Sequence, residues 1–190
     1  MSQPAYKILD EQIFTSGHYM LVPIRSKDRY KIMKWRNEQM FHLRQDKELT
    51  VEDQDVYFEN TVAKLFNQDQ PKQILFSFVK DKECIGYGGL VHINWKQRIA
   101  EVSFLMDTEL EKVQFKKLWL LYLDMIEKVA FSELDLVKIY VYAFDLRPHL
   151  YPILTLSGFV FDERIKNKIQ YKNNCIDVVI HSKYISDETY

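Results

Sequence analysis

The sequence predicts an α/β fold built on a mixed, mostly antiparallel sheet. The strongest observation is a strand, helix and strand pattern over 100–144: a short apolar-rich run, a long helical pattern and a second strand-like run at 137–144. Such a unit places its two strands in parallel, with a right-handed crossover. The second observation is that the strand-like runs before residue 100 follow one another through short turns, which predicts an antiparallel meander.

Size and composition favour one soluble domain over 1–190. The chain has 190 residues, of which 47% are hydrophobic and 14% aromatic, so a full core is expected and disorder is not. The formal net charge is −1 and no basic block stands out, which argues against nucleic acid as a partner. The N-terminal residues carry no secretory-signal pattern and no apolar run is long enough to span a bilayer, so we expect a cytoplasmic protein with no membrane partner. The two cysteines are too few for a disulfide framework.

The first half of the chain predicts two strands and two helices. A loose alternation over 6–14 suggests a short strand, and 19–25 reads as the first firm strand, where Pro23 indicates an edge position. Ser26 is the expected N-cap of a helix that ends near 35–38. Thr50, with Asp53 three residues later, resembles a capping pair for the second helix.

The meander and the central helix follow. Strands are expected over 73–79 and 83–94, and the second carries three glycines, which weaken a strand unless a bulge or a close neighbour requires them. After the strand that begins at Ala100, we expect a charged connector over 108–117 and then a helix that ends at Phe131. The helix has apolar residues three or four positions apart, which predicts a buried face: Phe115, Leu118, Trp119, Tyr122, Met125, Ile126 and Val129.

The last third predicts a short helix and two strands. Pro148 fits the first turn of a helix, and Gly158 occupies the place of its C-terminal cap. Strands are expected over 159–163 and 176–184. Ligands of parallel strand pairs bind beyond the C-terminal strand ends and at helix N-termini, so the first candidate site lies around 106–118.

Four segments in this order resemble the GNAT superfamily of acetyl-CoA-dependent N-acetyltransferases. ECIGYGGL at 83–90 is similar to the family's glycine-bearing strand, and AEVSF at 100–104 to the strand that contacts the pantetheine arm. Two further segments resemble the family: the end of the central helix with the strand after it, at 130–131 and 136–141, and LSGF at 156–159. The whole resemblance covers 19–184. The resemblance implies a V-shaped sheet with helices on both faces and acetyl-CoA as acyl donor. No group of His, Cys, Asp and Glu residues has metal-ligand spacing, so no metal is expected.

Within the superfamily, Trp35-Arg36-Asn37 is similar to a motif of enzymes that acetylate amino sugars. The resemblance therefore implies that these three residues bind a small-molecule amine, with Arg36 a candidate for a substrate phosphate. Two alternatives stay open: a protein N-terminal acetyltransferase, and a GNAT-like binding or scaffold protein without catalysis. A homodimer is also compatible with the resemblance.

The family's glycine-rich turn, which brings backbone N–H groups close to the coenzyme A pyrophosphate, is absent. Counting back from Ala130-Phe131, its place is taken by QFKKLW at 114–119, with Lys117 and Trp119 at the glycine positions. We expect Lys116, Lys117 and Leu118 to contact the cofactor there, with lysine charge replacing backbone amides.

The remaining site residues are also implied by the resemblance. Backbone N–H groups of Phe104, Leu105 and Met106 would polarise the thioester carbonyl, and Asp145 takes the place of a cofactor-binding Asn. Glu101 is the candidate base, whose alternative is an ordinary paired strand carboxylate. Tyr151 is the candidate acid for the leaving thiolate, with Tyr142 as its rival.

Overall fold

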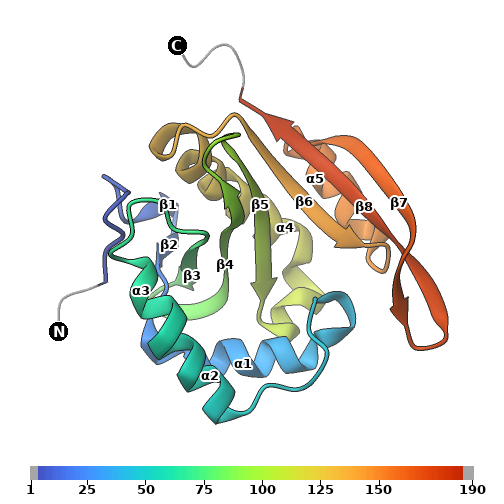
Figure 1. Ribbon diagram of the computed structural model, residues 1–190, viewed down its shortest axis with the longest axis horizontal. Coiled ribbons are helices and arrows are strands. Elements are labelled where there is room, and N and C mark those ends of the chain that lie inside the picture. Colours follow the sequence, from blue (N-terminus) through green and yellow to red (C-terminus); the bar gives the residue numbers. More distant parts are fainter. Residues whose placement is uncertain (1–3, 186–190) are drawn as a thin grey trace.

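The computed structural model describes residues 4–185, and in this part of the chain eight strands form one sheet in the order β1-β2-β3-β4-β5-β6-β8-β7 (Figure 1). The strands are β1 Phe14–Ser16, β2 Tyr19–Pro23, β3 Ile74–Lys80, β4 Glu83–Asn94, β5 Ile99–Met106, β6 Lys138–Phe144, β7 Val160–Tyr171 and β8 Asn174–Tyr184. The α-helices are α1 Arg29–Glu38, α2 Val51–Tyr57, α3 Ala63–Leu65, α4 Thr108–Glu127 and α5 Tyr151–Leu156. Short 3-10 turns precede α1 and α5, and a third lies at Met40–His42. Helix α2 is followed by a π-helical turn at Phe58–Val62, and α4 by one at Lys128–Glu133.

The predicted meander and parallel unit are both confirmed. Strands β3, β4 and β5 pair antiparallel in sequence order, whereas β5 and β6, joined by α4, pair in parallel. The parallel pairing spans only three register positions, Ile99↔Lys138 to Glu101↔Tyr140. Beyond them β6 stays paired with β8 and β5 with β4, so the sheet opens into two wings.

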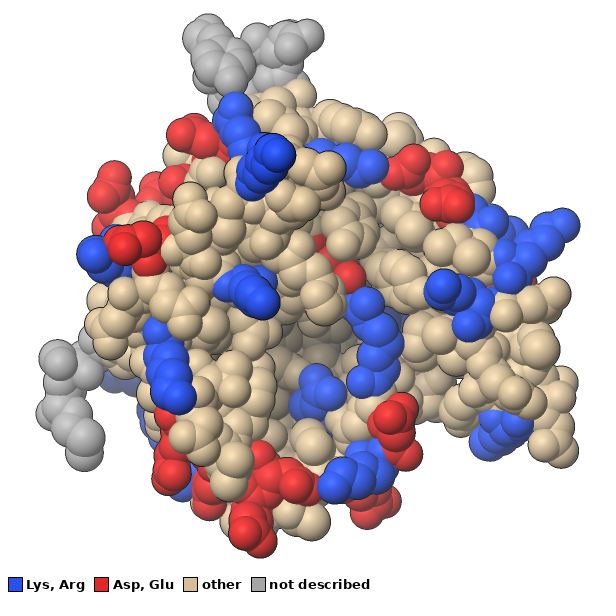
Figure 2. Space-filling model, in the orientation of Figure 1, with Lys and Arg blue, Asp and Glu red and all other residues tan. Residues whose placement is uncertain are grey.

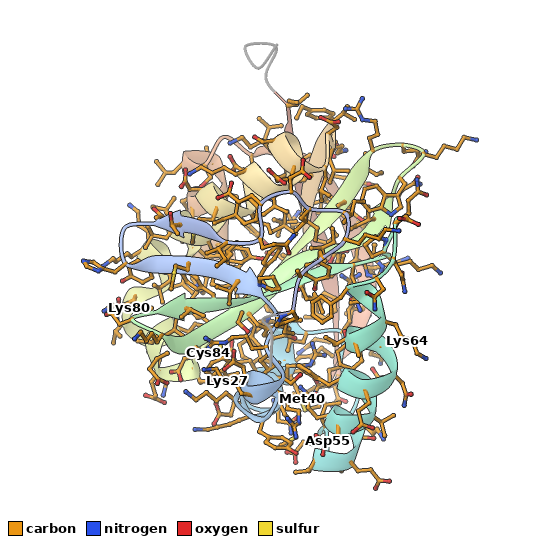
Figure 3. The ribbon with its side chains drawn as sticks, turned by 90° about the vertical axis from the view of Figure 1, so that its left-hand side faces the viewer. Lys27, Met40, Asp55, Lys64, Lys80 and Cys84 are labelled. Atoms are coloured by element: carbon orange, nitrogen blue, oxygen red, sulfur yellow. The ribbon has the colours of Figure 1, made fainter. Side chains whose placement is uncertain are left out.

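Helices cover both faces of the sheet. Helix α4 packs against β1, β2, β4 and β5, and α1 contacts α2, β4 and β5. In Figure 1, α4 and α5 lie behind the strands. Figure 3 shows the segment that carries Asp55 and Lys64 on the opposite side of the strands from α4. The layer of α1 and α2 and the layer of α4 and α5 therefore lie on opposite faces of the sheet.

Close packing of α4 against β4 and β5 explains a glycine in the middle of β4. The Tyr122 hydroxyl donates a hydrogen bond to the Ser103 carbonyl oxygen at 2.8 Å. A Cβ at Gly88 would lie 2.1 Å from that oxygen and 2.6 Å from the hydroxyl. The Phe104 ring stacks on Tyr122 with centroids 3.9 Å apart, so β5 and α4 share one aromatic core.

The charged connector predicted over 108–117 is wrong, because helix α4 begins at Thr108. Asp107 is its N-cap and accepts from the backbone N–H groups of Glu109 and Leu110. The other carboxylate oxygen of Asp107 accepts from the Trp35 indole N–H at 3.0 Å. Charged residues therefore occupy the first turns of a helix whose start is set by one aspartate.

Four local expectations are corrected. The first strand is Phe14–Ser16 rather than 6–14, and β1, not β2, is the sheet edge, so Pro23 lies at the end of an inner strand. Ser26 makes no capping hydrogen bond, because a 3-10 turn leads into α1. Strand β7 continues to Tyr171, beyond the expected end at 163.

Two capping expectations are confirmed. Thr50 and Asp53 form the reciprocal capping box at the start of α2. Gly158 follows α5 with a φ of 82°, the left-handed conformation of a C-terminal cap. None of the helices in residues 4–185 has the length and apolar character that a membrane crossing requires.

We predict that Asp107→Ala lowers the free energy of unfolding by about 2 kcal/mol, since it removes an N-cap and leaves the Trp35 indole N–H unpaired. Thr50→Ala is the matched control, because it removes an N-cap that has no second partner, and should cost about 1 kcal/mol. Urea denaturation of both variants measures the difference. Equal losses would show that the Trp35 contact contributes nothing.

Candidate active site

A cavity of about 390 Å³ occupies the opening between β5 and β6. Figure 2 shows a hollow at the centre of one face, with basic side chains at its edge and within it. The lining residues come from β4, β5, β6, α1, α4 and the segments that follow α1 and β6: Arg36, His42, Leu43, Arg44, His92, Glu101, Val102, Ser103, Phe104, Trp119, Val141, Tyr142, Ala143, Phe144, Arg147 and Leu150.

The cavity connects the two faces of the sheet. Side chains alternate along β5, so Phe104 stacks on the α4 side while Glu101 and Ser103 face the side of α1. Trp119 meets the Phe104 ring edge-on at 5.0 Å and is 2% exposed, so it belongs to the core and forms part of the cavity wall. The indole does not fill the opening, because the cavity passes beside it.

Glu101 is the one carboxylate among the residues that line this cavity. Its side chain is 5% exposed and forms an ion pair with Arg44, while His92 Nε2 lies 3.9 Å from its second oxygen. Burial raises the pKa of Glu101, and the charges of Arg44 and His92 offset only part of that shift. A buried carboxylate with a raised pKa beside a cavity is suited to proton transfer.

A bulge in β4 directs His92 toward Glu101. The register between β4 and β5 shifts between Val91 and Asn94, and His92 has a φ of 50°, which is uncommon for a residue other than glycine. Bulges of this kind re-aim side chains near functional sites. Sequence periodicity does not reveal it, because the strand pattern runs through the bulge unbroken.

Arg36 projects from α1 to the wall of this cavity. Its Nε donates to Gln45 Oε1 at 2.9 Å and its Nη1 donates to the Tyr87 hydroxyl at 2.7 Å. Within residues 4–185 no carboxylate lies within ion-pair distance of this guanidinium. Arg36 is thus a partly buried cation held by neutral partners.

A second cavity, of about 270 Å³, lies between α1, α2 and the sheet. Arg36 and Ser103 line both cavities, so the two spaces adjoin at these residues. The second cavity is otherwise lined mainly by neutral polar and apolar side chains: Leu49, Gln54, Tyr57, Gln73, Leu75, Tyr87 and Val91, together with Asp53.

Arg147 lies where the cavity meets the α4 layer. Its guanidinium, 12% exposed, donates to Glu111 in the first turns of α4 at 3.1 Å, and burial lowers its pKa. The neighbouring His149 ring meets Phe115 with centroids 4.5 Å apart. Burial, together with the charge of Arg147, lowers the pKa of His42 to about 3, so His42 is neutral at physiological pH.

Of the predicted cofactor residues on β5 and α4, one lines the opening and the others lie outside its lining. Phe104 lines the opening, whereas Leu105 and Met106 are buried outside its lining, and the Met106 carbonyl accepts from Gln39. Lys116, Lys117 and Leu118 lie within α4, where backbone N–H groups are engaged in helical hydrogen bonds. Lys117 Nζ lies over the Tyr19 ring at 5.4 Å, and Leu118 is 1% exposed.

Tyr151 and Asp145 pair with each other. The Tyr151 hydroxyl donates to Asp145 Oδ1 at 2.6 Å, and Asp145 also pairs with Arg164. Burial and the Asp145 carboxylate raise the pKa of Tyr151. Neither residue lines the cavity, whereas the rival Tyr142 does, with the Arg44 guanidinium 4.8 Å from its ring centroid.

The Trp35-Arg36-Asn37 triplet has one residue at the cavity and two structural residues. The Trp35 indole is 3% exposed and bonds Asp107. The Asn37 amide accepts from the Leu49 backbone and from Gln45, and donates to the Leu49 carbonyl. Asn37 therefore fixes the loop whose Gln45 holds Arg36.

Sequence reasoning did not single out Arg44, His92, Ser103 or Arg147 as site residues. Arg44 belongs to a polar connector and Arg147 to the segment before α5, and only tertiary contacts bring them to Glu101 and Glu111. Among residues 4–185 there is no cluster of three or more His, Cys, Asp and Glu side chains able to hold a metal ion.

Comparisons with known proteins agree with this architecture. Solved structures with the same fold include the spermidine N-acetyltransferase from Vibrio cholerae in complex with CoA and spermine. The two chains share 19% sequence identity and superpose with a TM-score of 0.75, and the match covers 89% of this chain and 96% of that one. A chimera of the Vibrio cholerae enzyme SpeG and hSSAT has 20% identity and a TM-score of 0.70 over 88% and 95%. Likeness at this identity establishes the fold and leaves the acceptor open.

A search of curated protein sequences finds no match. The family model for the acetyltransferase (GNAT) domain matches residues 21–180, which is most of the chain. The wedge between β5 and β6, the meander before it and this match lead to one conclusion: the chain belongs to the GNAT acetyltransferase family, the acyl-CoA-dependent N-acetyltransferases, whose acyl donor is acetyl-CoA.

Proposed function

We propose that this protein transfers an acetyl group from acetyl-CoA to the primary amine of a small polar molecule, most favourably an amino sugar. The observation that carries the proposal is the opening between β5 and β6, with Glu101 on its α1 side. The opening extends from the α4 layer to the α1 layer, so a thioester and an amine can approach one another from opposite faces.

The chain's own groups supply the proton chemistry. The amine nitrogen attacks the thioester carbonyl carbon, the C–S bond breaks and the thiolate leaves. Glu101 accepts the amine proton, directly or through a water molecule, and Arg44 holds the carboxylate. Beyond Glu101, β5 has no register partner on its β6 side, which supports the assignment of carbonyl polarisation to its backbone N–H groups near Phe104.

For the thiolate, the geometry favours Tyr142 over Tyr151 as proton donor. Tyr142 lines the cavity, whereas the Tyr151 hydroxyl already donates to Asp145 and its pKa is raised. A raised pKa makes the hydroxyl a weaker acid. Tyr151 and Asp145 are therefore proposed to stabilise the β6 to α5 connection.

Other acceptors and roles have less support. A polyamine is a polycation, and the first cavity is lined by three arginines against one carboxylate that is already paired. A protein N-terminus is disfavoured by the size of the second cavity, about 270 Å³, which suits a small ligand. A binding or scaffold role without catalysis would leave Glu101 as a structural partner of Arg44, whereas its raised pKa at the opening supports proton transfer.

The first test is acetylation itself. Pure protein with acetyl-CoA and an amino sugar should release free coenzyme A, and Glu101→Gln should lower kcat by about 100-fold or more, because it removes the proton acceptor. Glu59→Gln, which changes an exposed carboxylate, is the control and should match the wild type. Equal rates for Glu101→Gln and wild type would remove Glu101 from the mechanism.

The second test is the pH dependence of kcat/KM. Glu101 must be ionised to accept a proton, so kcat/KM should fall as the pH drops through its pKa in the free enzyme. Because burial raises that pKa, the fall should begin above the pH at which an ordinary glutamate titrates. The fall of kcat/KM at low pH should disappear in Glu101→Gln. If the fall persists in that variant, the titrating group is not Glu101.

We further propose that Arg147, rather than Lys116 or Lys117, binds the phosphates of the donor. Arg147 lines the cavity at the α4 layer, and Glu109 and Glu111 make the N-terminal turn of α4 acidic and unsuited to a pyrophosphate. Lys117 lies against Tyr19 instead. Arg147 then exchanges Glu111 for phosphate when the donor binds.

Arg147→Met should weaken coenzyme A binding by about 10-fold or more, since it removes charge-assisted hydrogen bonds. Binding of pantetheine, which has no phosphate, should be unchanged. Isothermal titration with both ligands measures the effect, and Lys117→Met is the matched comparison. A larger loss in Lys117→Met would return the phosphate contact to the lysines of α4.

A further inference from the structure

We infer that the acceptor carries an oxyanion, a phosphate or a carboxylate, that binds to Arg36. The inference rests on the proposed acetyl transfer and adds the chemical class of the acceptor. Arg36 is the cation that lines both cavities, at the point where they adjoin. Its position next to Ser103 of β5 places a bound anion close to the open end of the strand pair.

The first argument is the missing counter-charge. Arg25, Arg29, Arg44, Arg147 and Arg164 each pair with a carboxylate. Arg36, in contrast, is partly buried and bonds only the Gln45 amide and the Tyr87 hydroxyl in the described part of the chain. A charge taken out of water without a partner is unfavourable, so a ligand anion is the expected partner.

The second argument is the hydrogen-bonding capacity of the guanidinium. Gln45 engages Nε and Tyr87 engages Nη1, while Nη2 has no hydrogen-bond partner in residues 4–185. The second N–H of Nη1 and the N–H groups of Nη2 remain for a ligand, enough for two hydrogen bonds to an oxyanion. Gln45 is itself held by Asn37, so the guanidinium is fixed before a ligand arrives.

The third argument is the surroundings of Arg36. The second cavity presents the neutral side chains of Gln54, Tyr57 and Gln73, which suit hydroxyl groups. Its one carboxylate, Asp53, is engaged in the capping box of α2. The resulting site is polar and positively charged, as expected for a hydroxylated amine that carries an oxyanion. A positively charged site disfavours a polycation such as the spermine bound in the similar Vibrio cholerae structure.

The test compares four amines with acetyl-CoA at a fixed concentration: glucosamine, glucosamine 6-phosphate, muramic acid and spermidine. We expect kcat/KM for at least one of the two anionic sugars to exceed that for glucosamine by 10-fold or more, on the order of one charge-assisted hydrogen bond. Spermidine should be the poorest acceptor. Preference for the phosphate or the carboxylate sugar identifies which oxyanion the site accepts.

Arg36→Met should raise KM for the preferred anionic sugar by 10-fold or more, a clearly larger loss than the same variant shows on glucosamine. Arg36→Lys keeps the charge and loses the guanidinium, so it should restore only part of the affinity. Lys34→Met is the matched control, because it removes an exposed charge from the same helix, and it should behave as wild type. Circular dichroism confirms that each variant is folded.

Two results would overturn the inference while the acetyl transfer stands. The first is equal activity of the wild type on glucosamine and on both anionic sugars. The second is an equal loss of activity on all acceptors in Arg36→Met. In the second case Arg36 would act only by bracing Gln45 and Tyr87. Isothermal titration of the sugars without acetyl-CoA separates binding from catalysis. Arg36-dependent binding without acetylation of any amine would overturn the proposed function and keep the anion site. Neither binding nor acetylation would overturn both.

Discussion

The site depends on the loss of pairing between β5 and β6 beyond Glu101 and Tyr140. Each strand keeps its other neighbour, because β5 pairs with β4 and β6 with β8, so the opening costs few backbone hydrogen bonds. Side chains then determine what the opening contains. On the α4 side, Phe104 and Trp119 make an apolar wall, and on the α1 side Glu101 and Arg44 make a polar one. An opening with two chemically different walls suits a reaction in which a thioester and a polar amine meet.

Desolvation is the second constraint, and it gives the charges around the opening different roles. Glu101 is buried and its pKa is raised despite two nearby basic groups, so burial outweighs pairing at this carboxylate. Arg147 is also buried but pairs with Glu111 across the α4 contact. Arg36 has only neutral partners in the described part of the chain. A buried carboxylate, an arginine in an ion pair and an arginine with neutral partners within residues 4–185 therefore line the same cavity.

The sequence was informative where local chemistry decides the structure. Hydrophobic periodicity and short turns were enough to predict the meander and the parallel unit, and the spacing of Thr50 and Asp53 was enough to predict the N-cap of α2. It failed at the start of α4, because the charged residues after Asp107 read as a connector until the cap and its Trp35 contact are seen. Glu101 and Arg36 were identified through a motif, whereas Arg44 and His92 reach the site by a loop and a bulge that periodicity does not encode.

The early start of α4 also explains why this chain has no glycine turn. A glycine-rich turn is useful where a helix begins, because only there are backbone N–H groups free to face a phosphate. Here the helix begins at Thr108, before the aligned segment at 114–119, and Asp107 engages the backbone N–H groups of Glu109 and Leu110. Glycines at 117 and 119 would lie inside the helix, where they destabilise it and offer no donor. With these N–H groups engaged by Asp107, a side chain is the better candidate for the phosphate contact, and Arg147, which lines the cavity, is the residue that we propose for it.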